Sequence, residues 1–143
     1  MNARTTALSA LIAMRRQNAW ADGALKEYTA RARLDRRDAA LCARLLYGVV
    51  QNRMLLDFYL AQAVASPLAK LQPVVLDILR LGAYQILFLD KIPVSAAVNE
   101  AVEQTKTYAN KRAAGLVNGS LRTLARRKGE LEQPHDLATK YSH

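Results

Sequence analysis

The residues best suited to bind a ligand lie near the C-terminal end of the chain. An α-helix turns once every ~3.6 residues. At that spacing one helix face between residues 111 and 127 would carry Gly115, Asn118, Gly119, Arg122 and Arg126. Arginine donates hydrogen bonds in a fixed fork that matches a phosphate group, and glycine lets a partner approach the backbone. The pattern indicates a phosphate-binding surface, and an ordinary solvated helix face stays open as the alternative.

More arginines are concentrated in the N-terminal part of the chain. Those assigned to the same phosphate-binding role are Arg4, Arg15, Arg16, Arg36 and Arg37. The chain has 21 Lys and Arg against 12 Asp and Glu, and this net charge of +9 suggests a polyanionic partner. Residues 1–53 carry +6, residues 54–103 carry −2 and residues 104–143 carry +5. Antiparallel packing of helices could bring the two basic ends together on one side.

Arg80 has a different environment, because it lies inside the most apolar stretch of the chain. An unpaired charge in a protein interior is costly, so we expect a structural ion pair. The candidate partners are Asp77, three residues earlier, and Glu100 on the following helix. Arg80 is therefore predicted to stabilise the fold and not to take part in catalysis.

The sequence does not offer the residues of an assembled active site. The single cysteine, Cys42, lies in an apolar helical pattern and is predicted to be a small core residue. The two histidines, His135 and His143, lie in a polar tail, away from any nucleophile or second ligand. Neither the dinucleotide-binding glycine motif nor the P-loop motif is present. We therefore expect no catalytic residue, no metal site and no cofactor in this chain.

The elements that position these residues are predicted to be helices in one globular domain. The chain is 51% hydrophobic and has only 6 Gly and 4 Pro among 143 residues, which favours helix and suffices for a core. Seven segments show apolar residues at helical spacing. They are expected from Ala3 to Arg16, after a cap at Asp22, after a cap at Asp35, from Asn52 to before Ser66-Pro67, from Val74 to Leu89, after a cap at Ser95, and from a cap at Asn110 to Arg127.

The segment Val74–Leu89 is predicted to be the buried centre, because it is apolar almost all the way round. A membrane span needs about 20 apolar residues, and this segment is shorter and contains charges, so we expect no membrane association. Residues 129–143 are polar and contain Gly129 and Pro134. They are predicted to form a linker or tail after a helical domain of residues 1–128. The N-terminus lacks the features of a secretory signal, which suggests a cytoplasmic protein.

Three blocks of the sequence resemble the NusB-like family, in order and at matching spacing. They are Ile78-Leu-Arg-Leu-Gly-Ala-Tyr-Gln-Ile, Ile92-Pro-Val-Ser-Ala-Ala-Val-Asn-Glu-Ala-Val-Glu and Leu116-Val-Asn-Gly-Ser-Leu-Arg. The resemblance implies the fold of that family, an all-α bundle of about seven helices. This fold agrees with the seven apolar segments.

Within that superfamily the chain looks like the N-terminal domain of the RsmB (Sun/Fmu) family of 16S ribosomal RNA cytosine-5 methyltransferases. The segment Ala43-Arg-Leu-Leu-Tyr-Gly-Val-Val-Gln-Asn-Arg-Met-Leu-Leu-Asp resembles the methyltransferase version, as do Leu121-Arg and the tail Tyr141-Ser-His. The resemblance implies a domain that holds 16S ribosomal RNA for a C-terminal methyltransferase domain of the same protein. That second domain would bind S-adenosylmethionine. A chain that stops inside an apparent linker fits the front end of a larger enzyme.

Two other functions stay open at the level of sequence. The first is a free-standing NusB-type transcription antitermination factor. Such factors resemble this chain but carry an RNA-contacting aromatic residue near the position of Ile12, so Ile12 argues against RNA binding of the NusB type. The second is a protein-interaction module without RNA contact, in which the helix containing Asn99–Val102 faces a partner protein. In each case we expect a monomer.

Overall fold

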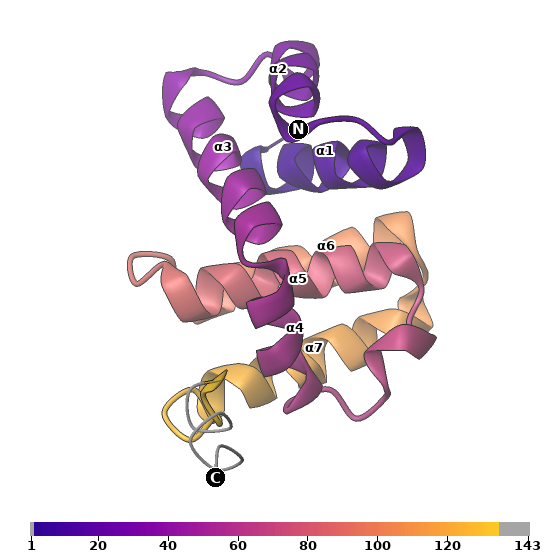
Figure 1. The fold of residues 1–143 in the computed structure, drawn as a ribbon, viewed down its shortest axis with the longest axis vertical. Coiled ribbons are helices and arrows are strands. Elements are labelled where there is room, and N and C mark those ends of the chain that lie inside the picture. The colour runs from indigo at the N-terminus through magenta and orange to yellow at the C-terminus, as the bar shows by residue number, and fades with distance from the viewer. Residues whose placement is uncertain (1, 135–143) are drawn as a thin grey trace, which may run out of the picture.

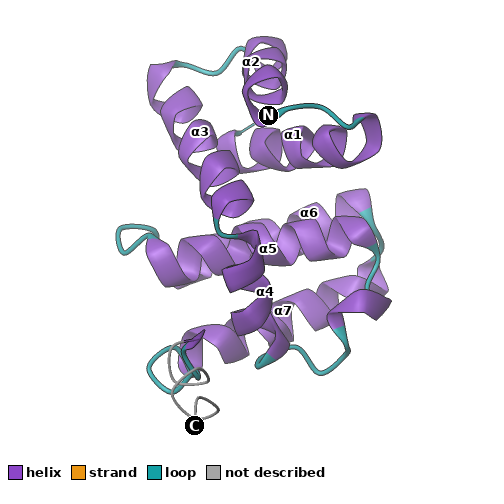
Figure 2. Ribbon diagram, viewed as in Figure 1, coloured by secondary structure: helices purple, strands orange, loops and turns teal. Residues whose placement is uncertain are grey.

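The computed structural model describes residues 2–134, and within that range it contains helices and no strand (Figure 2). The elements are α1 Ala3–Gln17, α2 Ala21–Ala32, α3 Arg36–Gln51, α4 Arg53–Ala61, the 3₁₀ helix η1 Leu68–Lys70, α5 Pro73–Phe88, α6 Val94–Tyr108 and α7 Lys111–Arg126. The prediction of an all-α fold with about seven helices is confirmed. The short η1 helix was not predicted.

The helices form two groups that meet on α5. Helices α1, α2 and α3 pack on one another, and α6 and α7 pack together and against α5. Helix α5 also contacts α1, α3 and α4. In Figure 1 the α1–α3 group occupies the upper end of the long axis and α7 the lower end, with α5 and α6 between them. The basic N-terminal helices and the basic helix α7 therefore lie at opposite ends of the molecule.

Helix α5 is the buried centre, as predicted. Eleven of its 16 residues are buried, and Pro73 occupies its first turn, where the missing N–H costs nothing. Two glycines let neighbouring helices approach this region closely. A Cβ added at Gly82 would lie 2.6 Å from Cδ1 of Leu121 on α7, and one added at Gly48 on α3 would overlap the ring of Tyr84. These contacts fix the spacing of α3 and α7 relative to α5.

Two of the predicted helix caps are confirmed. The carboxylate of Asp35 accepts a hydrogen bond from the backbone N–H of Asp38 at 2.8 Å, and Asn110 accepts one from Ala113 at 2.8 Å. Each satisfies a donor that the first turn leaves without a partner. A third cap was not predicted: the side chain of Asn2 accepts a hydrogen bond from the N–H of Thr5 at 2.8 Å.

The other two predicted caps, Asp22 and Ser95, are wrong. Helix α2 begins at Ala21, so Asp22 lies inside its first turn, where its carboxylate accepts a hydrogen bond from the hydroxyl of Tyr47 on α3. Helix α6 begins at Val94, directly after Pro93, and has no side-chain cap. The residues at the cap positions are Trp20 and Pro93, so both helices begin two residues earlier than predicted.

The fourth helix is shorter than predicted, and the segment after α7 packs on it. Helix α4 ends at Ala61, and Leu56 and Leu60 are its buried residues. Leu131 is buried in the core, and the side chain of Gln62 hydrogen-bonds to the backbone N–H and C=O of Glu132 at 2.8 and 3.1 Å. The first residues of the predicted linker therefore lie against the domain. His135, His143 and the Tyr141-Ser-His tail lie outside the described residues.

Candidate nucleic-acid interface

Helix α7 separates a buried face from an exposed one. Val117, Leu121 and Leu124 are fully buried against the core. On the other side Gly115, Gly119, Arg122 and Arg126 are exposed, while Asn118 is half-buried. The Nε of Arg122 donates to Oδ1 of Asn118 at 2.9 Å, which orients the guanidinium along the helix. We call Gly115, Asn118, Gly119, Arg122 and Arg126 the α7 basic face.

The two glycines of the α7 basic face are not needed for packing within residues 2–134. A Cβ added at Gly115 or Gly119 would have no atom within 4 Å apart from its chain neighbours and the backbone of its own helix. Glycine in the middle of a helix costs about 0.5–1 kcal/mol relative to alanine. Neither glycine recovers this cost through an internal contact, so the backbone here is open to something outside the domain.

Two further cations lie at the start of α7 and were missed by the sequence analysis. Lys111 and Arg112 are exposed in the first helical turn, directly after the Asn110 cap. The N-terminus of a helix carries partial positive charge, so cations there do not stabilise the helix. Their position after a recognisable cap was the signal that could have identified them.

The N-terminal arginines lie in the other half of the molecule. Arg16 is exposed at the end of α1, and Arg36 and Arg37 are exposed in the first turn of α3. We call Arg16, Arg36 and Arg37 the N-terminal basic group. Helices α1 and α3 lie at the upper end of Figure 1 and α7 at the lower end. The structure therefore does not bring the predicted residues into one patch.

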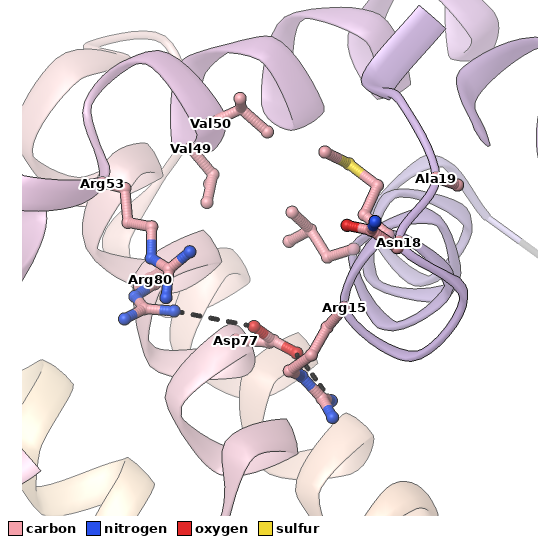
Figure 3. Close-up of a pocket in the computed structure, with 10 residues that line it drawn as sticks. Arg15, Asn18, Ala19, Val49, Val50, Arg53, Asp77 and Arg80 are labelled. Carbon is pink, nitrogen blue, oxygen red and sulfur yellow. Dashed lines mark hydrogen bonds and ion pairs between the residues drawn. The ribbon is translucent and has the colours of Figure 1, made fainter. Parts of the chain in front are cut away.

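Two of the predicted RNA-binding arginines make contacts inside the domain. Arg4 is half-buried, and its Nε donates to Oε1 of Gln85 on α5 at 2.7 Å. Arg15 donates from Nε and Nη2 to Oδ2 of Asp77 at 3.2 and 3.0 Å (Figure 3). Both side chains tie α1 to α5, so they have fewer free donors for an external phosphate than Arg16 has.

The buried arginine of α5 is paired, but its main partner differs from the prediction. The guanidinium of Arg80 binds the Asp57 carboxylate of α4 through Nε and Nη2, both at 2.8 Å. Its Nη1 lies 3.8 Å from Oδ1 of Asp77, so the Asp77 contact is present but longer. Glu100 is not a partner and accepts instead from Asn2 at 2.6 Å and Thr5 at 3.1 Å. No periodicity in the sequence indicates that α4 crosses α5 at Arg80.

Burial has the largest effect on the pKa of two core groups, Asp77 and Cys42. Burial raises the pKa of Asp77 above its ordinary value, although the guanidiniums of Arg15, Arg80 and Arg53 act in the opposite direction. Burial also raises the pKa of the Cys42 thiol to about 11, which keeps it protonated and unreactive at neutral pH. Among residues 2–134, no three metal-ligating side chains lie together, and none of the helices is long and apolar enough to cross a membrane.

Comparisons with known proteins show which sequences and structures this chain resembles. Residues 1–126 match the model of the NusB family. The chain is 37% identical to the probable ribosomal RNA small subunit methyltransferase B of Bacillus subtilis over 98% of its length, and it spans 32% of that relative. It is 37% identical to the transcription antitermination protein NusB of Ruminiclostridium cellulolyticum, covering 70% of this chain and 68% of the relative. The structure of T. maritima NusB has a TM-score of 0.79 and 25% identity, covering 87% of this chain and 88% of that one.

Proposed function

The chain belongs to the NusB family, and we propose that it is the N-terminal RNA-binding domain of a longer small-subunit ribosomal RNA methyltransferase. The observation that carries this proposal is the extent of the match. The similarity to the Bacillus subtilis methyltransferase covers 98% of this chain but only 32% of the relative. A chain of this kind supplies a helical domain, and the remaining two thirds of such a protein would supply catalysis.

The role of the domain in this proposal is to hold 16S ribosomal RNA for a separate catalytic domain. That domain would carry out cytosine-5 methylation with S-adenosylmethionine, and we assign no residue of this chain to the cofactor. Basic side chains bind RNA phosphates by releasing condensed counterions, which gives affinity without strong sequence preference. Sequence choice would come from RNA shape and from the catalytic domain. We place the protein in the cytoplasm as a monomer.

The side chains proposed to contact RNA first are Arg122, Arg126 and Asn118 of the α7 basic face. Their support is exposure together with the open backbone at Gly115 and Gly119. The N-terminal basic group, Arg16, Arg36 and Arg37, is proposed as a second contact. Arg4 and Arg15 contribute less, because each already donates to an acceptor on α5.

A free-standing antitermination factor is the less favoured alternative. The match to the Ruminiclostridium antitermination protein covers 70% of this chain, against 98% for the Bacillus methyltransferase, at equal identity. The reading frame in its genome separates the two proposals. An antitermination factor requires a gene that ends near codon 143, whereas a methyltransferase requires about 300 further codons, given that the chain spans 32% of its relative.

The proposed RNA binding is tested by titrating the chain against a fluorescently labelled 16S ribosomal RNA fragment at several salt concentrations. We expect the logarithm of the association constant to fall linearly with the logarithm of salt concentration, because each phosphate contact releases counterions. The double variant Arg122→Glu/Arg126→Glu should bind at least about tenfold more weakly and show a shallower slope. Its circular dichroism should be unchanged, since both side chains are exposed.

The matched control is Lys70→Glu/Lys91→Glu, which changes the net charge equally at two exposed lysines outside both basic groups. A general charge effect would weaken both double variants alike and would remove the α7 basic face from the proposal. Absence of binding by the parent chain at about 50 mM salt would overturn the RNA-binding function itself.

A further inference from the structure

Phe88, the last residue of α5, exposes a large part of its aromatic ring. The residue is 40% exposed, and its ring stacks on that of the buried Tyr84, with the ring centroids 5.3 Å apart and the ring planes 21° apart. This stacking holds the Phe88 ring in a fixed orientation. Aromatic side chains bury roughly 150–250 Å² each when they pack, so a ring left in water forfeits a large favourable contribution. An exposed ring that is already held in place is suited to bind an external partner.

Phe88 lines a surface pocket of about 460 Å³. Leu41 and Arg44 of α3 line the same pocket, together with the rest of residues 88–92, which connect α5 to α6. Helix α3 and the α5–α6 connection both lie on the left of Figure 1. We call the pocket lined by residues 41, 44 and 88–92 the Phe88 pocket. Pockets that hold small ligands run from about 300 to 1,000 Å³, so the Phe88 pocket has room for one nucleobase.

Two cations without a partner also line the Phe88 pocket. Arg44 and Lys91 are both exposed, and neither forms an ion pair or a side-chain hydrogen bond with any residue that the structure describes. Asp90 is the one carboxylate among the lining residues, and its side chain is 94% exposed and lies 3.9 Å from Nζ of Lys128. The pocket therefore places an exposed aromatic ring next to two cations that have no counter-ion within residues 2–134.

The Phe88 pocket is continuous with the N-terminal basic group along one face of α3. Arg37, Leu41 and Arg44 are spaced by four and three residues, which places them on the same side of the helix. Arg37 belongs to the N-terminal basic group, and Arg44 follows it by about 10 Å along the helix axis, at ~1.5 Å per residue. An RNA strand that contacts Arg37 can therefore continue to the pocket.

We propose that the Phe88 pocket binds one unpaired base of single-stranded RNA, which stacks on Phe88 while Arg44 and Lys91 bind the adjoining phosphates. Aromatic rings beside cations are the features by which proteins hold single strands, because every base has a face that can stack. The bases of a duplex are already stacked on one another and cannot reach such a ring. The proposal rests on the RNA-binding function above. It adds strand selectivity to the N-terminal basic group, whose phosphate contacts alone would not distinguish one RNA from another.

The two cations favour RNA over an apolar protein surface as the occupant. An apolar partner would cover Phe88 but would leave Arg44 and Lys91 at the interface without counter-charges, which is costly. RNA supplies a base for the ring and phosphates for the cations. Both parts of a nucleotide are therefore matched by residues that line one pocket.

The aromatic half of the site is tested with Phe88→Leu, which keeps apolar bulk against Tyr84 but removes the ring. The chain is titrated with a labelled, unstructured ribo-oligonucleotide of about eight residues and with the same strand annealed to its complement, and binding is followed by fluorescence anisotropy. We expect Phe88→Leu to weaken single-strand binding by about fivefold or more, the lower limit for loss of one base–aromatic stack, and duplex binding by less than about twofold. Phe88→Tyr should keep most of the affinity, since a ring remains. Thermal unfolding checks that both variants stay folded.

The charged half of the site is tested with Arg44→Gln. The matched control is Arg53→Gln, because Arg53 is also exposed but does not line the pocket. We expect Arg44→Gln to weaken single-strand binding by about threefold or more and to reduce the salt slope by about 0.7, the value for one phosphate contact on a single strand. The control should change neither. The two lysines of the charge control above should separate in the same way, because Lys91→Glu should weaken single-strand binding and Lys70→Glu should leave it unchanged.

Three results would overturn the proposed base-binding pocket. Unchanged single-strand affinity in Phe88→Leu, with RNA still bound, would overturn the pocket and leave the RNA-binding function intact; a pocket that serves a protein partner would give this result. Equal losses on the single strand and the duplex would also overturn it, because only the single strand has an unpaired base to stack. No binding of either RNA by the parent chain at about 50 mM salt would overturn both proposals.

Discussion

At the scale of single residues, the arginines predicted to bind RNA fall into two groups, those that already contact another residue of the domain and those that are free at the surface. Arg4 and Arg15 were grouped with the surface arginines by residue type, yet both donate to acceptors on α5. Arg36, Arg37 and Arg126 are exposed. A guanidinium held by an acceptor inside the domain must give up that contact before it can bind a phosphate, so the contacts that a side chain already makes rank these candidates better than residue type does.

The pairing of Arg80 with Asp57 should contribute substantially to stability. The Asp57→Asn substitution keeps the side-chain size and one acceptor oxygen but removes the charge, so Asp77, at 3.8 Å, becomes the one carboxylate paired with the buried guanidinium. We expect the free energy of unfolding, measured by urea denaturation, to fall by about 3 kcal/mol. Asp90→Asn is the control, because Asp90 is 94% exposed and its contact to Lys128 is 3.9 Å long. Equal losses of unfolding free energy in the two variants would show that the buried pair stabilises the fold no more than the exposed pair does.

Cys42 should be inert in the folded protein. Burial raises its pKa to about 11, so at pH 8 the thiol is protonated and also sterically shielded. Iodoacetamide should modify it many-fold faster in urea than in buffer. Since the folded state holds this proton more tightly than the unfolded state, its contribution to stability falls as pH rises from 9.0 to about 11. Equal labelling rates with and without urea would contradict the burial of this thiol.

At the scale of helices, α7 shows how one element serves two surfaces. Its apolar side fills the space beside Gly82, while its other side presents two glycines at which an added Cβ would meet open space. The glycines of the protein differ in whether a side chain could be accommodated at their position. Gly82 and Gly48 are small because a neighbouring side chain occupies the position of a Cβ, whereas Gly115 and Gly119 have empty space there. Helical spacing placed Gly115 and Gly119 on the outer face of their helix, but nothing in the sequence indicated the contacts at Gly48 and Gly82.

Alanine substitutions should separate these two kinds of glycine. Gly115→Ala and Gly119→Ala should each stabilise the protein by about 0.5–1 kcal/mol, because alanine loses less backbone entropy in a helix and meets no obstacle here. Gly48→Ala should destabilise it by about 1–3 kcal/mol, since the ring of Tyr84 must move. Thermal unfolding measures both effects. If the α7 basic face approaches RNA closely, the two stabilised variants should also bind RNA more weakly. A loss of stability in Gly115→Ala would mean that this site is not open.

At the scale of the whole molecule, the positive charge is divided between two ends. The N-terminal basic group lies on α1 and α3, and the α7 basic face lies at the other end of the long axis (Figure 1). Helices α5 and α6 separate them, in a part of the chain whose net charge is −2 over residues 54–103. A long RNA can contact both ends, whereas a short oligonucleotide can contact only one.

This separation predicts additive effects on long RNA. Arg122→Glu/Arg126→Glu and Arg36→Glu/Arg37→Glu should each weaken binding of a ribosomal RNA fragment, and the free-energy losses should sum to within about 0.5 kcal/mol in the combined variant. A ribo-oligonucleotide of about four residues should respond to one pair or the other and not to both. Fluorescence anisotropy with both RNAs measures this. Strong non-additivity on the long RNA would indicate that the two groups contact the same few phosphates.

The sequence by itself determined the elements of this protein, and the tertiary structure decided which residues they bring together. Apolar periodicity located the seven helices and the buried centre at Val74–Leu89, and the caps at Asp35 and Asn110 followed from contacts within four residues. These features are local, so nearby residues specify them. The Asp57–Arg80 pair, the Arg15–Asp77 pair and the separation of the two basic groups depend on where helices cross. Side-chain packing between segments that are distant in the sequence sets where the helices cross. The apolar periodicity of one helix does not indicate which other helix it crosses.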